Sequence, residues 1–207
     1  MPSLADSARG LPLVADLLSR CTFPTSGTNV DCAVSGGADS VSLLVLACAA
    51  NLNVTAWHVD HGLRDNSHTE TKLVAQLAAQ LGAQFESRTV SVEQGANTEA
   101  RAREARYAVL PHGVMTGHTA DDQAETILIN LLRGSGTRGL AGMQPTAQRP
   151  LLQIRRSETE ALCAELGIAV FNDPSNDDER FQRNRIRHEV LPLMESLAKR
   201  DLVPVLT

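Results

Sequence analysis

Apolar residues follow two spacings that alternate along the chain. Short apolar runs predict strands, and longer segments with apolar residues three and four positions apart predict helices. The predicted strands are 30–34, 54–59, 84–90 and 114–117. The predicted helices are 11–18, 41–50, 67–81, 98–110, 121–132, a segment from about 157 to 166, and 186–198. Because strands and helices alternate, we expect an α/β fold with an open, mostly parallel, doubly wound sheet.

Several helix boundaries are predicted from short polar motifs. Ser67-His68-Thr69-Glu70 is a capping box, and Gly82 ends the helix that it opens. Ser157-Glu158-Thr159-Glu160 is expected to cap a later helix. Pro192 should kink or divide the last one. We predict a catalytic domain over residues 1–155 and a short C-terminal helical extension over 156–207, packed on the same domain.

The most informative motif is Ser35-Gly36-Gly37-Ala38-Asp39-Ser40, which joins the first strand to a helix. A glycine turn at a helix N-terminus presents backbone N–H groups and the positive end of the helix dipole, which together favour an anion. Gly36 and Gly37 let the main chain approach a phosphate closely. An ordinary strand-to-helix turn is the alternative, but the flanking serines and aspartate favour a nucleotide phosphate.

The type of phosphate loop follows from what the motif lacks. A Walker loop needs a lysine after its last glycine, and the first lysine of the chain is Lys72. A dinucleotide fingerprint needs a third glycine. Asp39 leaves two possibilities open: it holds Mg²⁺ that bridges to phosphate, or it turns inward and caps backbone donors. The motif resembles the loop of the PP-loop ATP pyrophosphatases, which implies attack on the α-phosphate with pyrophosphate as leaving group.

Polar residues also follow the second and fourth predicted strands. Ligands of open α/β sheets bind beyond the carboxyl ends of the strands. We therefore assign His58 to the nucleotide, and Asp60, His61 and Arg64 to substrate or phosphate, with a solvated loop as the alternative. His118 follows the fourth strand and joins the same rim.

Two carboxylates near His118 share one helix face, because Asp122 and Glu125 are three residues apart. Acidic residues at a helix start are also useful caps, which explains Asp121 but explains Glu125 less well. The pair is therefore predicted to hold Mg²⁺ or a substrate ammonium.

Two arginine-rich segments could contact phosphate or RNA. Arg103 and Arg106 lie three apart in the helix predicted at 98–110. Arg183 and Arg187 belong to the most basic stretch of the chain. In the first segment, intrahelical pairs such as Glu99–Arg103 account for part of the charge. In the second, a solvated helix start is the alternative, and spacing alone does not separate it from a contact with RNA or pyrophosphate.

Composition narrows the class of protein. The chain has 207 residues, of which 43% are hydrophobic and only 3% aromatic, so aliphatic residues must form its core. Its four cysteines are far apart, which argues against zinc, an iron–sulfur cluster or a disulfide framework. The net charge of −5 gives no overall attraction to nucleic acid. Without a membrane-length apolar run or a signal-peptide pattern, a cytoplasmic protein is expected.

The motifs appear together, in order, in one enzyme family. They are Ser35–Ser40, His58–Arg64, Ala102–Tyr107, Gly117–Thr126, Leu132–Gly136, Asp173–Asn176 and Arg183–Arg187. From residue 30 to about 192 the chain resembles the tRNA(Ile)-lysidine synthetase family. Such enzymes attach L-lysine to the wobble cytidine of tRNA(Ile) with a CAU anticodon, using ATP.

The resemblance implies a role for each motif. Ser35 to Ser40, Ala38 included, would hold ATP phosphates with Mg²⁺ near Asp39. Cytidine O2 would attack the α-phosphate, and lysine would then displace AMP. The lysine and metal would be handled by His118, Asp122 and Glu125. The arginines, including Arg133, would steady phosphate or tRNA.

The resemblance leaves some questions open. Many members continue into C-terminal domains that help to select the tRNA, whereas this chain stops at Thr207, as a natural short form or a truncated one. The enzyme alternative is 2-thiocytidine synthesis on the same fold, which needs a set of cysteines that the chain lacks. The other alternative is a non-catalytic ATP-binding module, which would not need His118, Asp122 and Glu125.

Overall fold

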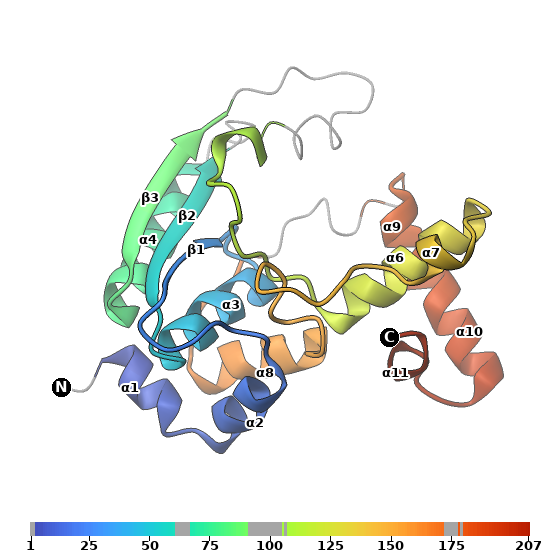
Figure 1. Cartoon of the computed structure of the whole chain (residues 1–207), viewed down its shortest axis with the longest axis horizontal. Coiled ribbons are helices and arrows are strands. Elements are labelled where there is room, and N and C mark those ends of the chain that lie inside the picture. The colour runs from blue at the N-terminus through green and yellow to red at the C-terminus, as the bar shows by residue number, and fades with distance from the viewer. Residues whose placement is uncertain (1–2, 61–66, 91–104, 106, 172–177, 179) are drawn as a thin grey trace.

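The computed structural model describes residues 3–60, 67–90, 105, 107–171, 178 and 180–207. Figure 1 shows a parallel sheet with helices packed against it, and a second group of helices on the other side of the molecule. No helix in the described part of the chain is both long and apolar enough to span a membrane.

Within the described residues, the sheet has three parallel strands in the order β1 (Asn29–Ala33), β2 (Asn53–Asp60) and β3 (Gln84–Thr89). This confirms the predicted open α/β sheet. The predicted fourth strand is wrong in extent, because 114–117 contributes a single parallel bridge between Met115 and Cys32. The reason is that the chain leaves β1 at the next residue, where the Thr116 N–H donates to Gln148 O at 2.9 Å.

The helices α3 (Ala38–Ala49) and α4 (Ser67–Leu81) connect the three strands and pack against each other on one face of the sheet. Right-handed crossovers between strands taken in one direction put both helices on the same side. Every residue of α3 from Ser40 to Ala49 is buried. Therefore the loop before α3 is held rigidly at the carboxyl end of β1.

Three further helices cover α3: α1 (Leu4–Arg9), α2 (Pro12–Arg20) and α8 (Arg156–Glu165). The sequence pattern did not predict α1. Leu162 and Cys163 of α8 belong to the same apolar cluster as α3 and the strands. Residues after 155 thus contribute to the core of the sheet, and the division at 155 stays a prediction about domains.

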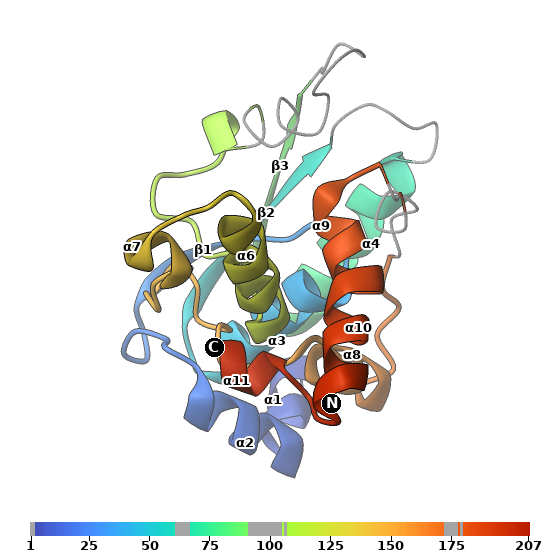
Figure 2. The ribbon, with the colours of Figure 1, turned by 90° about the vertical axis from the view of Figure 1, so that its right-hand side faces the viewer.

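The second group of helices surrounds α6 (Ala120–Leu132), and Figure 2 looks directly onto it. Ala124 and Leu128 of α6 pack with Ile186, Leu191 and Val203 in a separate apolar cluster. The other helices of the group are α7 (Thr137–Leu140), α9 (Gln182–Arg185), the π-helix η2 (Ile186–Val190), α10 (Leu191–Ala198) and α11 (Val203–Leu206).

The predicted break near Pro192 takes the form of the π-helix η2. The Leu191 N–H donates to Ile186 O, five residues earlier, and Pro192 follows without an N–H of its own. A π turn inserts one residue into a helix, so the chain stays helical through the proline.

The predicted cap of α8 is wrong. The helix begins at Arg156 rather than after Ser157, and the Glu158 carboxylate accepts from the Arg155 N–H at 2.8 Å. The Arg156 N–H donates to Asp121 Oδ2 at 2.7 Å, so a contact with α6 sets the start of α8. The helix predicted at 98–110 lies mostly outside the described residues.

Candidate functional site

The loop between β1 and α3 has the predicted strand–turn–helix geometry. Gly36 has φ +95°, in the left-handed region that favours glycine, and a Cβ there would meet the Phe171 ring at 3.3 Å. Gly37 is the N-cap residue of α3, and no side chain accepts a hydrogen bond from the first N–H groups of this helix. The dipole of a buried helix therefore points at an uncapped turn.

Ser40 occupies part of this loop. Its Oγ accepts from the N–H groups of Ser35 at 3.1 Å and Gly36 at 3.2 Å, and it donates to Gly37 O at 2.9 Å. In the described part of the chain, the N–H groups of Gly37, Ala38 and Asp39 have no acceptor within hydrogen-bond distance. The N–H groups that could bind an anion therefore lie at the N-terminus of α3 rather than at the first residues of the motif.

His58 is buried and bonds to the residue that precedes the loop. It is 3% exposed, and its Nδ1 donates to Val34 O at 2.8 Å. Of the other residues predicted near it, Asp60 ends β2, and its carbonyl accepts from Val90 N–H at 2.8 Å. His61 and Arg64 lie outside the described residues. So do Arg103 and Arg106.

Gly117, directly before His118, lies against the backbone at the start of α3. A Cβ on Gly117 would lie 2.6 Å from Asp39 O and 3.0 Å from Ser40 N. No side chain fits at that distance, so glycine lets the two backbones touch. His118 follows directly, with its Nδ1 2.7 Å from Thr116 Oγ1.

The start of α6 is capped by Thr119 and Asp122. Asp122 Oδ2 accepts from Thr119 N–H at 2.9 Å, and Thr119 Oγ1 accepts in return from Asp122 N–H at 3.4 Å. The capping role suggested for an acidic residue here therefore applies to Asp122. Its other oxygen, Oδ1, remains free to bind an arginine.

Asp121 has a different role from the simple cap that the sequence suggested. Its Oδ1 accepts from Arg155 Nη2 at 3.1 Å, and its Oδ2 accepts from the Arg156 N–H. Arg155 also pairs with Asp201. Asp121 thus ties the start of α8 to α6.

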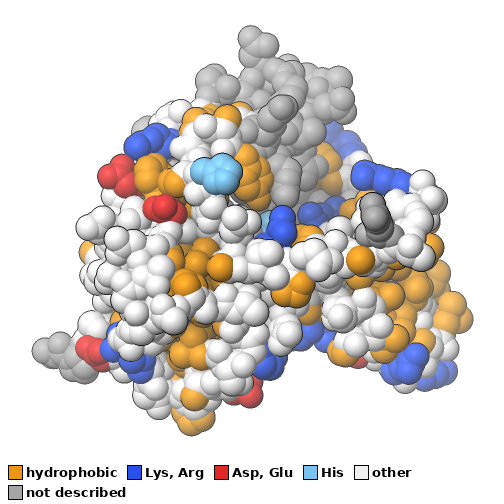
Figure 3. Space-filling model, viewed as in Figure 1, with side chains coloured by type: hydrophobic (Ala, Val, Ile, Leu, Met, Phe, Trp, Pro, Cys, Tyr) orange, Lys and Arg blue, Asp and Glu red, His pale blue; other side chains and the backbone are white. Residues whose placement is uncertain are grey.

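Three carboxylates and three arginines form a compact cluster, which we call the carboxylate–arginine cluster. Its members are Asp39, Asp122, Glu125, Arg156, Arg183 and Arg187. In the space-filling view, basic side chains gather in a hollow between the sheet and the helices around α6 (Figure 3).

Glu125 is the centre of the cluster, with a side chain that is only 1% exposed. Its Oε1 accepts from Arg187 Nε at 2.7 Å and from Arg156 Nη1 at 3.2 Å. Its Oε2 accepts from Arg183 Nε at 2.7 Å. A buried carboxylate needs such partners, because an unpaired charge in the interior is very costly. The sequence predicted Glu125, Arg183 and Arg187 separately, and the structure brings them together.

Arg156 joins the cluster to the phosphate loop. Its guanidinium donates to Asp39 Oδ2 at 3.3 Å, to Asp122 Oδ1 at 3.1 Å and to Glu125 Oε1 at 3.2 Å. Among the described residues it is the one side chain that contacts all three carboxylates. Sequence reasoning missed it, because nothing near residue 156 differs from an ordinary helix start.

The Asp39 side chain points inward, towards α8 rather than towards the backbone donors of the loop. Thr159 Oγ1 donates to its Oδ1 at 2.5 Å, and Arg156 takes its Oδ2. No group of three or more His, Cys, Asp or Glu side chains in the described ranges is arranged to hold a metal.

The cluster shifts the pKa values of two carboxyl groups in opposite directions. Burial raises the pKa of Asp39, and the opposing effect of Arg156 is smaller. Burial is also the largest single effect on Asp122, but Arg156, Arg183, the Thr119 N–H and His118 together outweigh it, and the pKa of Asp122 is lowered. Asp122 is therefore the more strongly stabilised anion of the two.

Asp122→Asn provides a test of this electrostatic balance. A lowered pKa in the folded chain means that the ionised carboxylate stabilises the fold above the ordinary aspartate pKa of about 4. This contribution is lost as the pH falls through the lowered pKa. In urea unfolding, wild type should be more stable than the variant at pH 7, and the gap should narrow below about pH 4. A gap independent of pH would contradict the assignment.

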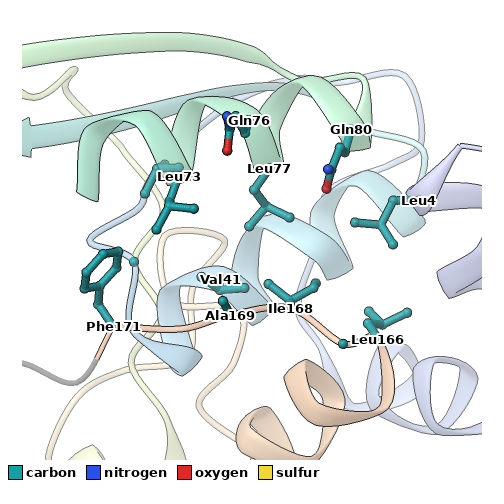
Figure 4. A pocket seen from close by; sticks show the side chains of 13 residues that line it. Leu4, Val41, Leu73, Gln76, Leu77, Gln80, Leu166, Ile168, Ala169 and Phe171 are labelled. Atoms are coloured by element: carbon teal, nitrogen blue, oxygen red, sulfur yellow. The ribbon is translucent and has the colours of Figure 1, made fainter. Parts of the chain in front are cut away.

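A separate cavity of about 240 Å³ lies next to Gly36, between α4 and the segment 166–171. Figure 4 shows that its lining is mostly apolar, with Leu73, Leu77 and Phe171 facing inward. It meets the loop only at Gly36 and includes no residue of the carboxylate–arginine cluster. Arg133, the remaining predicted residue, is an exposed C-cap of α6, also outside the cluster.

Two solved structures are similar to the chain in fold. They are a U34-tRNA thiolase, NcsA, from Methanococcus maripaludis (TM-score 0.67, 17% identity, 94% of this chain and 74% of that one) and an NMN synthetase from Francisella tularensis (TM-score 0.53, 15% identity, 95% and 87%). At these identities the likeness concerns the fold alone.

Similarity in sequence is more specific. The tRNA(Ile)-lysidine synthases of Rhodococcus erythropolis and Nocardia farcinica are 46% and 44% identical to the chain over 174 and 185 residues. The matches cover 80% and 84% of this chain but 54% and 58% of those proteins, so the chain spans just over half the length of these curated relatives. A model of the PP-loop domain matches residues 14–194. The chain therefore belongs to the family of PP-loop domains, an ATP-binding family.

Proposed function

We propose that the chain catalyses ligation of L-lysine to the wobble cytidine of a tRNA(Ile) with a CAU anticodon, converting ATP to AMP and pyrophosphate. One observation carries this proposal: Arg156 bridges Asp39, at the uncapped start of α3, to the carboxylates of Asp122 and buried Glu125. A reaction that uses a nucleotide phosphate and an amine needs both features in one site. The names of the relatives support the same reaction.

The first step is adenylation of the cytidine. The N–H groups of Gly37, Ala38 and Asp39 would bind the β- and γ-phosphates at the positive end of α3. The α-phosphorus then faces the open side of the site. Cytidine O2 attacks it, a new P–O bond forms, and the bond to the bridging oxygen breaks, so pyrophosphate leaves with the electron pair.

The second step replaces AMP by lysine at cytidine C2. The ε-amine has an ordinary pKa of about 10.4, so almost all of it arrives as ammonium. Asp122 and Glu125 are the carboxylates that would hold and orient this ammonium, and His118 is the group that would accept its proton. The neutral nitrogen then forms the C–N bond at C2 as the C–O bond to AMP breaks.

Mg²⁺ is proposed as the companion of ATP, with Asp39 as its tentative ligand. Both oxygens of Asp39 already accept from Arg156 and Thr159, so Asp39 fits a metal only after Arg156 leaves it. When bound, the ion would neutralise charge on the phosphates. We further propose a cytoplasmic location, where ATP and tRNA are available.

The cysteines do not support the thiolation alternative. Cys32, Cys48 and Cys163 are buried and Cys21 is half-buried. Burial raises the pKa of the Cys21 thiol to about 12 and that of Cys48 to about 11, which makes both poor nucleophiles.

The proposal is tested by mass spectrometry of the tRNA product. The chain is incubated with ATP, Mg²⁺, lysine and the tRNA, and the wobble nucleoside should gain one lysine less one water. Omitting lysine should remove the product while leaving some tRNA-dependent pyrophosphate release. ATP binding with an unchanged nucleoside under all conditions would favour a module without turnover.

A further inference from the structure

We propose that Arg156 couples the binding of the nucleotide to the binding of the amine substrate. Its guanidinium would leave Asp122 and Glu125 for the phosphates of ATP, and the carboxylates so released would accept the lysine ammonium. This inference rests on the proposed function and adds a binding order to it, with ATP before lysine.

The first argument is position. Arg156 contacts Asp39, the second residue of α3, and through its other nitrogens contacts both carboxylates of α6. Gly37 and Ala38, whose amides form the proposed phosphate site, directly precede Asp39 in the chain. In the proposed coupling, the side chain of Arg156 turns from the carboxylates of α6 towards the start of α3 and carries its positive charge with it.

The second argument is charge. The cluster contains three carboxylates and three guanidinium groups, so it is self-neutralised when all six are ionised. An incoming ammonium would be a fourth cation next to three carboxylates. It can bind well only when one of the arginines withdraws.

The third argument is the strength of the contacts. Arg183 and Arg187 each place Nε 2.7 Å from a Glu125 oxygen, and Arg183 also donates to Asp122 O and Thr126 Oγ1. Arg156 makes three longer contacts, of 3.1–3.3 Å, to three different groups. Its hydrogen bonds are thus individually the longer ones, although the three carboxylates together outweigh burial and raise the pKa of its guanidinium. Phosphate is a strong competing partner for a guanidinium.

The backbone beneath Arg156 can stay fixed while the side chain moves. Its N–H is anchored to Asp121, and Thr159 continues to bind Asp39 when the guanidinium leaves. The movement therefore requires no rearrangement of α8.

The coupling is measured by calorimetric titration of lysine into the chain, with and without saturating α,β-methylene-ATP and Mg²⁺. This analogue cannot release pyrophosphate, so binding is separated from chemistry. We expect the analogue to tighten lysine binding at least about fivefold. Reciprocity requires lysine to tighten analogue binding by the same factor.

Two variants assign the coupling to Arg156. Arg156→Met removes the competing cation, so lysine should bind without the nucleotide at least as tightly as it binds wild type with it, and the effect of the analogue should disappear. Arg155→Met, at the neighbouring position in the chain, is the matched control: it loses the ion pairs with Asp121 and Asp201 but no contact with the cluster. It should keep the coupling, and a thermal melt of both variants reports on folding.

The outcomes are distinct. If wild type binds lysine equally well with and without the analogue, the inference is overturned and the proposed function stands. If Arg156→Met weakens both ligands but keeps their coupling, Arg156 is a structural residue and the inference is again wrong. If lysine binds in neither state while the analogue binds, the proposed function fails together with the inference.

Discussion

Glu125→Gln is expected to lower the rate of the proposed reaction, lysidine formation, by about 30-fold to a few thousandfold. Glu125 is the centre of the carboxylate–arginine cluster, and the neutral amide can neither balance the arginines nor hold an ammonium. Removing one partner of a buried, hydrogen-bonded charge pair typically costs about 2–5 kcal/mol, which corresponds to that range of rates. The rate is measured as lysidine formed under saturating ATP and tRNA.

The Glu125→Gln variant should also have a lower free energy of unfolding than wild type. Three arginines would face two carboxylates, and breaking a buried ion pair costs roughly 3–5 kcal/mol. Glu189→Gln is the matched control, because Glu189 pairs with Arg185 on the same helical segment but is 45% exposed. That control should change the free energy of unfolding and the activation free energy of the reaction by less than about 1 kcal/mol each. A Glu125→Gln enzyme with the wild-type rate would contradict the role assigned to the cluster.

Gly117→Ala should also damage the site, although it changes no charged group. The new methyl would meet Asp39 C at 2.8 Å as well as Asp39 O and Ser40 N, all of them backbone atoms at the end of buried α3. Because α3 has no room to retreat, the variant should lose about 1–3 kcal/mol of stability. We expect ATP binding to weaken as well, since the displaced peptides adjoin the amides assigned to phosphate.

A second glycine provides the comparison. Gly136 has φ −70°, and a Cβ there would meet no atom within 4 Å. Gly136→Ala should therefore keep wild-type stability and ATP affinity, measured by urea unfolding and by calorimetry. Equal behaviour of the two variants would show that the close approach at Gly117 does not position the loop.

The sequence predicted those parts of the fold that depend on local signals. The glycine turn before α3, the end of α4 at Gly82 and the alternation of strands and helices are written within short segments. The length of the fourth strand was overestimated. The strand ends because the Thr116 N–H donates to Gln148 O instead of to β1, and Gln148 is more than thirty residues away in sequence. The start of α8 was misplaced for the same reason, since Asp121 rather than a local cap fixes it.

The sequence named several members of the carboxylate–arginine cluster but not the ion pairs that join them. His118, Asp122 and Glu125 were found from their position after a strand, and Arg183 from its basic surroundings. Arg156 was missed because its three partners lie on α3 and α6, and no spacing within α8 reveals them. The inward turn of Asp39 was one of two possibilities that the sequence left open, but its partners on α8 were not predicted.

The central claim is that the amides at the start of α3 bind the pyrophosphate end of ATP beside the carboxylate–arginine cluster. A crystal structure with α,β-methylene-ATP and Mg²⁺ tests it most directly. We predict β- and γ-phosphate oxygens within hydrogen-bond distance of the N–H groups of Gly37, Ala38 and Asp39, with the α-phosphorus facing His118. Phosphates bound elsewhere, with Ser40 still closing the loop, would contradict it.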